Sequence, residues 1–289
     1  MRNPFTYGVI ASGNSFCNRT EEMEQLVRAA ENGEKLHIHG NRRTGKTSLL
    51  KRTIRNIEET GGLCFYIDVW KCFEPSDFTR ICGEAFAGYA ERGGSALQKL
   101  SRIFSGISPS FSIGDDGKIA LSFVPVPSAD EGIPLRKLLE APMRISEMEP
   151  GRTILVVMDE FQQVRKISGT RYERIIRSVI QEQQDIAWFF CGSSSTILMN
   201  MFQKRSSPLY RSCGQFPLGS IPSEHWRKHI TDMFEGTGKT ISDEALTLIL
   251  NCTEGIPGYT QQLCHALWDL TDKGAEAHIV AKAVDLLID

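Results

Sequence analysis

Apolar positions follow two different patterns along the chain, and the change between them falls near Pro222. Before it, short apolar runs that suit β-strands alternate with stripes at helical spacing. The predicted strands lie at 36–38, 63–69, 153–158, 186–191 and 215–221. After it, only helical stripes follow, around 226–233, 246–250, 259–267 and 280–287. The pattern therefore predicts about five strands within residues 1–221 and a separate helical domain over residues 222–289.

The strands of the first part have the character of a parallel sheet. Residues 153–158 are apolar without alternation, as expected for a strand covered on both faces. The strand at 36–38 runs into Gly40, and an apolar helical stripe over 50–57 follows, so the order is strand, glycine loop, helix. Further helices are predicted over 20–30, 78–89 and 135–148.

Two local signals add detail to this picture. Asn18 is placed to cap the helix over 20–30, with Glu21 three residues later as in a capping box. Between about 108 and 125, two alternating segments flank Asp115, Asp116 and Gly117, which suit a hairpin turn. We therefore expect a β-hairpin inserted into the first domain.

Composition narrows the class of protein. The 289 residues include 33 basic and 35 acidic side chains, and a net charge of -2 does not favour DNA as a partner. The eight cysteines lie far apart with no CxxC pair, which suits reduced thiols in a cytosol. No apolar run approaches the ~18 residues that a membrane span needs, so we expect a cytoplasmic protein without membrane contact.

The loop after the first strand carries the most specific motif. Residues 40–47 read Gly-Asn-Arg-Arg-Thr-Gly-Lys-Thr, which satisfies the Walker A pattern in the strand–loop–helix context that the pattern requires. Backbone N–H groups of such a loop face phosphate oxygens, Lys46 would reach the β and γ phosphates, and Thr47 would bind Mg²⁺. The predicted nucleotide contacts here are Gly40, Asn41, Arg42, Arg43, Thr44, Gly45, Lys46, Thr47 and Ser48. A glycine-rich turn without a ligand is the structural alternative.

Adjacent acids end a later strand. Asp159 closes the apolar run 153–158, where a Walker B carboxylate can hold Mg²⁺, and Glu160 would polarise the attacking water. A solvated acidic pair at a strand end is the alternative.

Two further residues are candidates for catalysis. Ser193 follows the strand 186–191 and would hydrogen-bond the same water or the γ phosphate, although serines 193–195 would serve equally as a helix N-cap cluster. Arg211 is a candidate to stabilise charge on the triphosphate, in cis or from a neighbouring subunit.

Together these residues resemble the archaeal-type ATPase family of the STAND branch of P-loop NTPases, which also occurs in bacteria. The likeness runs from Asn3 to about Leu270. Besides the two Walker motifs it covers Asn3-Pro4-Phe5 with Phe16-Cys17-Asn18-Arg19, Gly192-Ser193, Pro208-Leu209-Tyr210 and Gly255-Ile256-Pro257.

The resemblance implies an α/β P-loop NTPase fold of the AAA/STAND-like, additional-strand type, followed by a small all-helical lid. Its parallel five-stranded core sheet would place the Walker B strand between the P-loop strand and residues 63–69. It assigns Arg19 to the segment near the adenine, Pro257 to the base and Ser193 to sensing. It also implies ATP or ADP with Mg²⁺ as ligands, and slow hydrolysis in a switch whose nucleotide state changes lid position or assembly.

Several functions stay open on the sequence alone. An ATP-gated DNA-binding protein of origin-recognition type shares the motif order, although the net charge does not support it. A nucleotide-holding scaffold without turnover would use the hairpin for docking. A protein partner and self-association both stay open. The GTPase motif Asn-Lys-x-Asp is absent from the sequence, which favours adenine over guanine only indirectly.

Overall fold

The computed structural model describes residues 2–11, 13–90, 96–105, 109–113, 119–123, 132–193 and 195–288. The chain divides into two compact units. We call the first the helical unit, and it combines Met1–Glu24, Gly40–Arg52 and Pro217–Asp289. The second, the sheet unit, combines Gln25–His39 with Thr53–Phe216.

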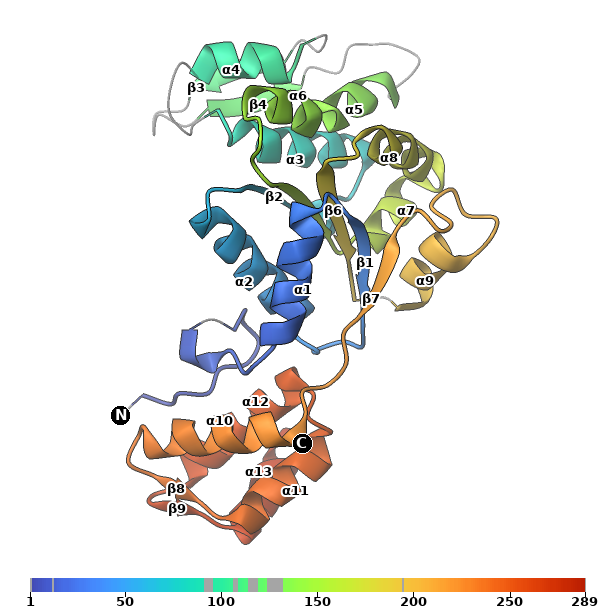
Figure 1. The fold of residues 1–289 in the computed structure, drawn as a ribbon. Coiled ribbons are helices and arrows are strands. Elements are labelled where there is room, and N and C mark those ends of the chain that lie inside the picture. The colour runs from blue at the N-terminus through green and yellow to red at the C-terminus, as the bar shows by residue number, and fades with distance from the viewer. Residues whose placement is uncertain are drawn as a thin grey trace. The chain divides into compact units, whose positions relative to one another are not determined.

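A five-stranded sheet forms the centre of the sheet unit, in the order β2-β5-β6-β1-β7 (Figure 1). The strands are β1 (Lys35–His39), β2 (Leu63–Asp68), β5 (Ile154–Asp159), β6 (Ile186–Cys191) and β7 (Gly214–Pro217). β2 pairs with β5, β5 with β6, and β6 with β1, each in parallel. The prediction that the Walker B strand lies between the P-loop strand and the strand at 63–69 is confirmed, with β6 also between them.

Burial explains why the central strands are apolar without alternation. Every residue of β5 and of β6 is buried, because helices cover the sheet. Phe161, Phe190 and Phe202 meet in the core, and the Phe161 and Phe190 ring centroids lie 4.7 Å apart. The surrounding helices are α3 (Pro75–Ala87), α4 (Ala96–Ile103), α5 (Gly132–Leu139), α6 (Ala141–Met148), α7 (Gln162–Ser168), α8 (Arg171–Glu182) and α9 (Ser195–Gln203).

Two predictions for the middle of the chain are refined by the structure. The single helix expected over 135–148 is two helices that break at Glu140, because Pro142 lacks an N–H to continue a helical ladder and instead stands in the first turn of α6. The hairpin is present as β3 (Pro109–Ile113) and β4 (Ile119–Phe123), which pair antiparallel. Its expected turn at 115–117 lies outside the described residues.

The helical unit is built mainly from α10 (Ser223–Glu235), α11 (Asp243–Thr253), α12 (Pro257–Leu270) and α13 (Ala277–Ile288). Their apolar stripes form one core, and Phe5 of the N-terminal segment joins it with its ring 5.4 Å from Phe234. The region after Pro222 is therefore mainly helical as predicted, with one addition. The two-residue strands β8 (Thr240–Ile241) and β9 (Gly274–Ala275) pair in parallel, and they are too short to leave a sequence signal.

The remaining elements connect these parts of the chain. They are η1 (Gly13–Ser15), α1 (Thr20–Glu31), α2 (Lys46–Glu59) and η2 (Val69–Lys71). The predicted capping role of Asn18 is wrong, because α1 begins at Thr20 and Arg19 is the residue directly before it. Asn18 also has a left-handed backbone with φ of 50°, whereas an N-cap residue is typically extended.

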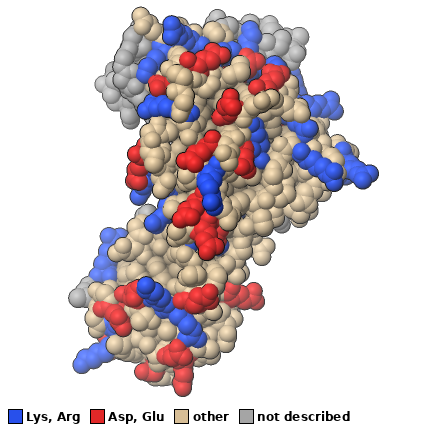
Figure 2. All heavy atoms as spheres, in the orientation of Figure 1, with Lys and Arg blue, Asp and Glu red and all other residues tan. Residues whose placement is uncertain are grey.

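The structure also describes the cysteines and the charged surface. All eight cysteines are free thiols. Acidic and basic side chains are interspersed on the face of each unit that Figure 2 shows. Among the described helices, none combines the length and hydrophobicity needed to cross a membrane.

Candidate nucleotide site

The Walker A loop lies in the helical unit and has the backbone that its glycines allow. Gly45 has φ of 84° and Arg43 has φ of 64°, so the loop turns through the left-handed region twice. A Cβ atom at Gly40 would lie 2.3 Å from the carbonyl oxygen of Leu218, so only glycine fits there. The loop then passes into α2, whose first residue is Lys46.

Lys46 folds back over this loop. Its side chain is only 7% exposed, and its Nζ donates to the carbonyl oxygens of Gly40 (2.9 Å) and Asn41 (2.7 Å). The Thr44 hydroxyl also donates to the Asn41 carbonyl at 2.9 Å. The cation is therefore held at the loop, where the following amides and the N-terminus of α2 favour an anion. Thr47 is half-buried in the first turn of the same helix.

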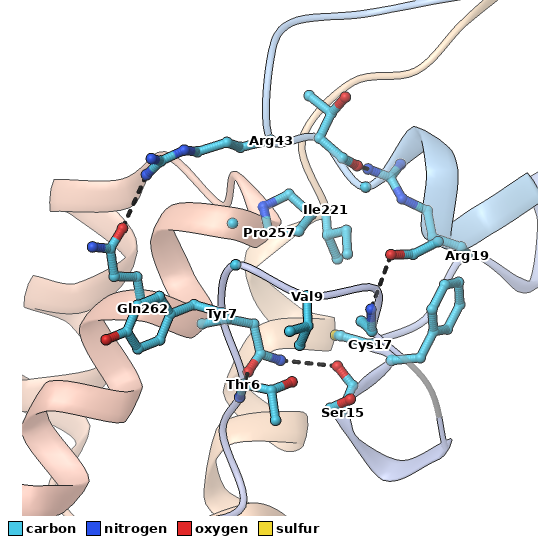
Figure 3. Close-up of a pocket in the computed structure, with 18 of the residues that line it drawn as sticks. Thr6, Tyr7, Val9, Ser15, Cys17, Arg19, Arg43, Ile221, Pro257 and Gln262 are labelled. Atoms are coloured by element: carbon cyan, nitrogen blue, oxygen red, sulfur yellow. Dashed lines mark hydrogen bonds between the residues drawn. The ribbon is translucent and has the colours of Figure 1, made fainter. Parts of the chain in front are cut away.

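A cavity of about 380 Å³ opens beside the loop, entirely within the helical unit (Figure 3). Three segments line it: the N-terminal segment, the Walker A loop, and the region of α10 and α12. Val9, Ile221 and Pro257 supply apolar surface (Figure 3). Of the predicted nucleotide residues, the lining includes Arg19, Arg43, Thr44, Gly45, Ser48 and Pro257.

Arg43 ties the loop to helix α12. Its guanidinium donates to Gln262 Oε1 at 2.9 Å (Figure 3). The same guanidinium lies 5.0 Å from the ring centroid of Tyr259. The Gly258 N–H donates to the Arg43 carbonyl at 2.9 Å, and a Cβ at Gly258 would lie 2.6 Å from Arg43 Cβ. The Walker A loop and the first turn of α12 are thus joined by backbone and side-chain contacts.

Arg19 is a buried structural link at the edge of the cavity. It is 5% exposed, pairs with Glu22, and donates to the carbonyl oxygens of Thr44 and Gly219. It therefore holds the Walker A loop against the segment that leads into the lid. In the same segment, burial raises the pKa of the Cys17 thiol to about 12, so this cysteine stays protonated at neutral pH.

Gln261 is a cavity residue that sequence reasoning missed. Its Oε1 accepts from the Thr6 N–H at 3.2 Å, and its Nε2 donates to the Ser15 carbonyl at 2.9 Å. Ser48, in the first turn of α2, similarly accepts from the Ala11 N–H at 3.1 Å. These bonds fix the N-terminal segment as a wall of the cavity. No local pattern reveals Gln261, because its partners lie about 250 residues away in the chain.

The candidate acids lie in the sheet unit. Asp159 ends β5 and is 3% exposed. Its Oδ2 accepts from the Tyr66 hydroxyl at 2.7 Å, and its Oδ1 accepts from the Glu160 N–H at 2.9 Å. Burial, followed by the nearby Asp159 charge, raises the pKa of Tyr66 above its usual range, so the phenol keeps its proton. Tyr66 was not a sequence-predicted site residue.

Glu160 follows directly and is held by two donors. Its Oε2 accepts from the Ser193 hydroxyl at 2.9 Å and from the Gln162 amide. A Cβ atom at Gly192 would meet the Gln162 side-chain amide, so a larger residue there would require this amide to move. Because α9 begins at Ser195, Ser193 lies two residues before the helix and contacts the acid. Ser194 lies outside the described residues.

Arg211 stands on an exposed turn of the sheet unit. Its guanidinium lies 5.2 Å from the ring centroid of Tyr210, and its backbone is left-handed with φ of 52°. Arg177 donates to the Tyr210 carbonyl at 2.9 Å and anchors the turn. The arginine is therefore presented on an anchored turn.

Comparison with solved structures identifies the fold. The Walker-type ATPase PABY2304 of Pyrococcus abyssi is similar with a TM-score of 0.64 at 17% identity, over 94% of this chain and 73% of that one. The ORC2 protein of Aeropyrum pernix, in its ADPNP-ADP complexes, gives 0.60 at 16% identity, over 98% and 71%. The ORC1 protein of Aeropyrum pernix in complex with DNA gives 0.57 at 15% identity, over 95% and 66%. The expected P-loop ATPase fold is confirmed.

Family membership rests on the sequence match. No curated protein sequence matches the chain. A family model described as an ATPase domain predominantly from Archaea matches residues 16–263, which include both Walker motifs. The chain therefore belongs to this family of predominantly archaeal ATPase domains.

Proposed function

We propose that the chain binds ATP and ADP with Mg²⁺ at the Walker A loop and hydrolyses ATP slowly, as a nucleotide-dependent switch of the STAND type. The observation that carries the proposal is the cavity that opens beside a correctly formed Walker A loop within one unit. A glycine-rich turn without a ligand would not require a neighbouring cavity.

The loop supplies the phosphate site. Backbone N–H groups near Gly45 and the N-terminus of α2 favour the negative charge of phosphates. Lys46 already lies over the loop, so its ammonium needs only to exchange the carbonyls of Gly40 and Asn41 for phosphate oxygens. A phosphate oxygen is a stronger acceptor than a carbonyl because it is charged.

The cavity supplies the base site. Its volume of about 380 Å³ falls in the range of small-molecule pockets. Val9, Ile221 and Pro257 offer apolar surface to a flat aromatic ring, and the N-terminal segment adds backbone groups that can read its polar edge. Arg19 acts here through Thr44 and Gly219, as a residue that positions the cavity wall.

The acids supply the chemistry. β1 and β5 run parallel in one sheet, and the chain leaves β1 at Gly40 and β5 at Asp159. The buried Asp159 carboxylate and the Thr47 hydroxyl are hard oxygen donors of the kind Mg²⁺ prefers, and the ion would neutralise charge on the phosphates. Glu160 then accepts a proton from water, while Ser193 orients its carboxylate.

The contact between Arg43 and α12 supports the switch. Arg43 belongs to the loop that would hold phosphate, and its carbonyl and guanidinium bind Gly258, Tyr259 and Gln262 of α12. A change in loop conformation on nucleotide binding is therefore transmitted to the lid helix. Hydrolysis would reverse the signal, which is the behaviour of a timed switch.

DNA binding is the second candidate. It rests on the likeness in fold to the ORC1 protein that was solved with DNA. The net charge of -2 and the interspersed charges in Figure 2 weigh against it. A salt-dependent shift of duplex DNA by the protein would favour it, because phosphate contacts weaken as salt rises.

Thermal stability tests the proposed binding function. ATP and ADP with Mg²⁺ at about 100 times the Kd are expected to raise Tm by about 5 °C, because they bind the folded state only. GTP is expected to give a smaller shift. Lys46→Ala should lose the shift while keeping the unliganded Tm within a few degrees. An equal shift in Lys46→Ala, or none in the wild type, would contradict the proposal.

A further inference from the structure

Tyr66 of β2 contacts the candidate magnesium ligand directly. In the parallel pairing of β2 and β5, Tyr66 is opposite Val157, two residues before Asp159. Residues two apart on a strand share a face, so Tyr66 and Asp159 point to the same side of the sheet. The Tyr66 side chain reaches from β2 to the end of β5, where its hydroxyl donates to Asp159 Oδ2 at 2.7 Å.

Both oxygens of the Asp159 carboxylate are thereby engaged. Oδ2 accepts from Tyr66, and Oδ1 accepts from the N–H of Glu160 at 2.9 Å. A carboxylate has about four lone-pair sites, so each oxygen can still accept another bond. Two donors on different oxygens fix the rotation of the carboxylate about its χ2 torsion, which is otherwise broad.

We propose that Tyr66 is a positioning residue, which orients Asp159 toward the Mg²⁺ of the bound nucleotide. The inference rests on the proposed nucleotide function and adds to it a residue outside the Walker motifs. Hydrogen bonds to a ligating carboxylate orient it and tune its affinity for the metal. Tyr66 lies on a different strand from the acid, so it also fixes the acid relative to β2.

A second tyrosine of the sheet unit provides a matched control. The Tyr89 hydroxyl donates to Glu149 Oε1 at 2.6 Å, and the Tyr89 side chain is buried, whereas that of Tyr66 is half-buried. Neither residue belongs to the proposed site. Tyr89→Phe therefore removes the same kind of phenol–carboxylate bond with consequences for stability alone.

The experiment measures the effect of Mg²⁺ on ADP affinity by calorimetry. ADP is titrated into the wild type, Tyr66→Phe and Tyr89→Phe, once with excess Mg²⁺ and once with EDTA. In the wild type, we expect the Kd in EDTA to exceed the Kd in Mg²⁺. Tyr66→Phe should reduce this ratio, Kd in EDTA divided by Kd in Mg²⁺, about tenfold, with its Kd in EDTA unchanged. Tyr89→Phe should keep the wild-type ratio. An unchanged ratio in folded Tyr66→Phe would overturn the inference.

A double-mutant cycle keeps the test decisive if stability changes as well. In an Asp159→Asn background, Tyr66→Phe should reduce the Mg²⁺ effect no further, because the tyrosine acts through the acid. Independent, additive losses would overturn the inference. The proposed function fails separately, since in that case the wild type would bind no ADP in either buffer.

Discussion

The two units hold their candidate functional groups by different means. In the helical unit, the candidate groups are held mainly through the backbone. Gly40 and Gly45 allow the loop conformation, and Gln261 fixes the cavity wall by hydrogen bonds to backbone groups. In the sheet unit, side chains hold side chains, since Tyr66 donates to Asp159 and Ser193 to Glu160. The first arrangement suits binding of a ligand, and the second suits control of two carboxylates.

Because of this difference, we expect substitutions in the two units to affect different quantities, nucleotide affinity in one and hydrolysis rate in the other. In the proposed function, the phosphate and base contacts come from residues of the helical unit, so changes there should alter the Kd of the nucleotide. Glu160 and the groups that hold it belong to the sheet unit, so changes there should alter the rate of hydrolysis. An interaction made only in the transition state changes kcat without changing binding.

The largest expected effect is on turnover. Glu160→Gln keeps the side chain's size but removes the base, so phosphate release should fall by about 10²- to 10⁴-fold. Its ADP affinity should stay within about threefold of the wild type, because binding groups are untouched. The measurement is steady-state phosphate release beside ADP titration. Normal hydrolysis by Glu160→Gln would disprove the assignment of the base, and no hydrolysis by the wild type would favour a scaffold.

The next effect concerns stability of the sheet unit in acid. His37 is fully buried, stacks on Phe202 and bonds Gln215, and burial lowers its pKa to about 4. The unfolded chain takes up a proton near pH 6.5, whereas the folded chain does not. Stability from this residue is therefore complete above pH 6.5 and falls as the pH drops toward 4.

Between pH 7 and pH 5, the lowered pKa of His37 should reduce the free energy of unfolding by about 2 kcal/mol. Urea unfolding of the wild type and His37→Phe at both pH values checks it. The variant should lose less stability on acidification. Some dependence will remain, because burial also lowers the pKa of His229 in the helical unit. An identical pH dependence in His37→Phe would contradict the prediction.

Periodicity predicted most strands and helices of the fold, whereas the place of the Walker B strand in the sheet came from the family resemblance. Strand β5 is apolar throughout because both faces are covered, and the sequence carries that signal directly. Features that depend on only one or two residues leave no periodic signal and were harder to predict. The break between α5 and α6 depends on Pro142, and β8 and β9 contain only two residues each.

Candidate residues at strand ends could be predicted because their motifs are local. Asp159 and Glu160 are adjacent in the chain, and Lys46 lies inside the Walker A loop. Tyr66 could not be found in this way, because its role depends on the register between β2 and β5, 93 residues apart. The partners of Arg43 on α12 were missed for the same reason, since Gln262 lies 219 residues away.

The smallest expected effect tests the link between the loop and the lid. Tyr259→Ala removes the ring beneath the Arg43 guanidinium and leaves the Walker A loop intact. Such a contact is worth about 0.5–1 kcal/mol at an exposed site, so ADP affinity should fall about two- to fivefold. Tyr259→Phe keeps an aromatic face and should bind almost as the wild type does.

Arg43→Ala should weaken ADP binding at least as much, because it also loses the bond to Gln262. Adding Tyr259→Ala to Arg43→Ala should then change the affinity little further, since the pair shares one contact. Calorimetry on the two single variants and the double variant measures the coupling. Fully additive losses would show that α12 and the Walker A loop act on the nucleotide independently, and would remove the structural basis for a lid that follows the loop.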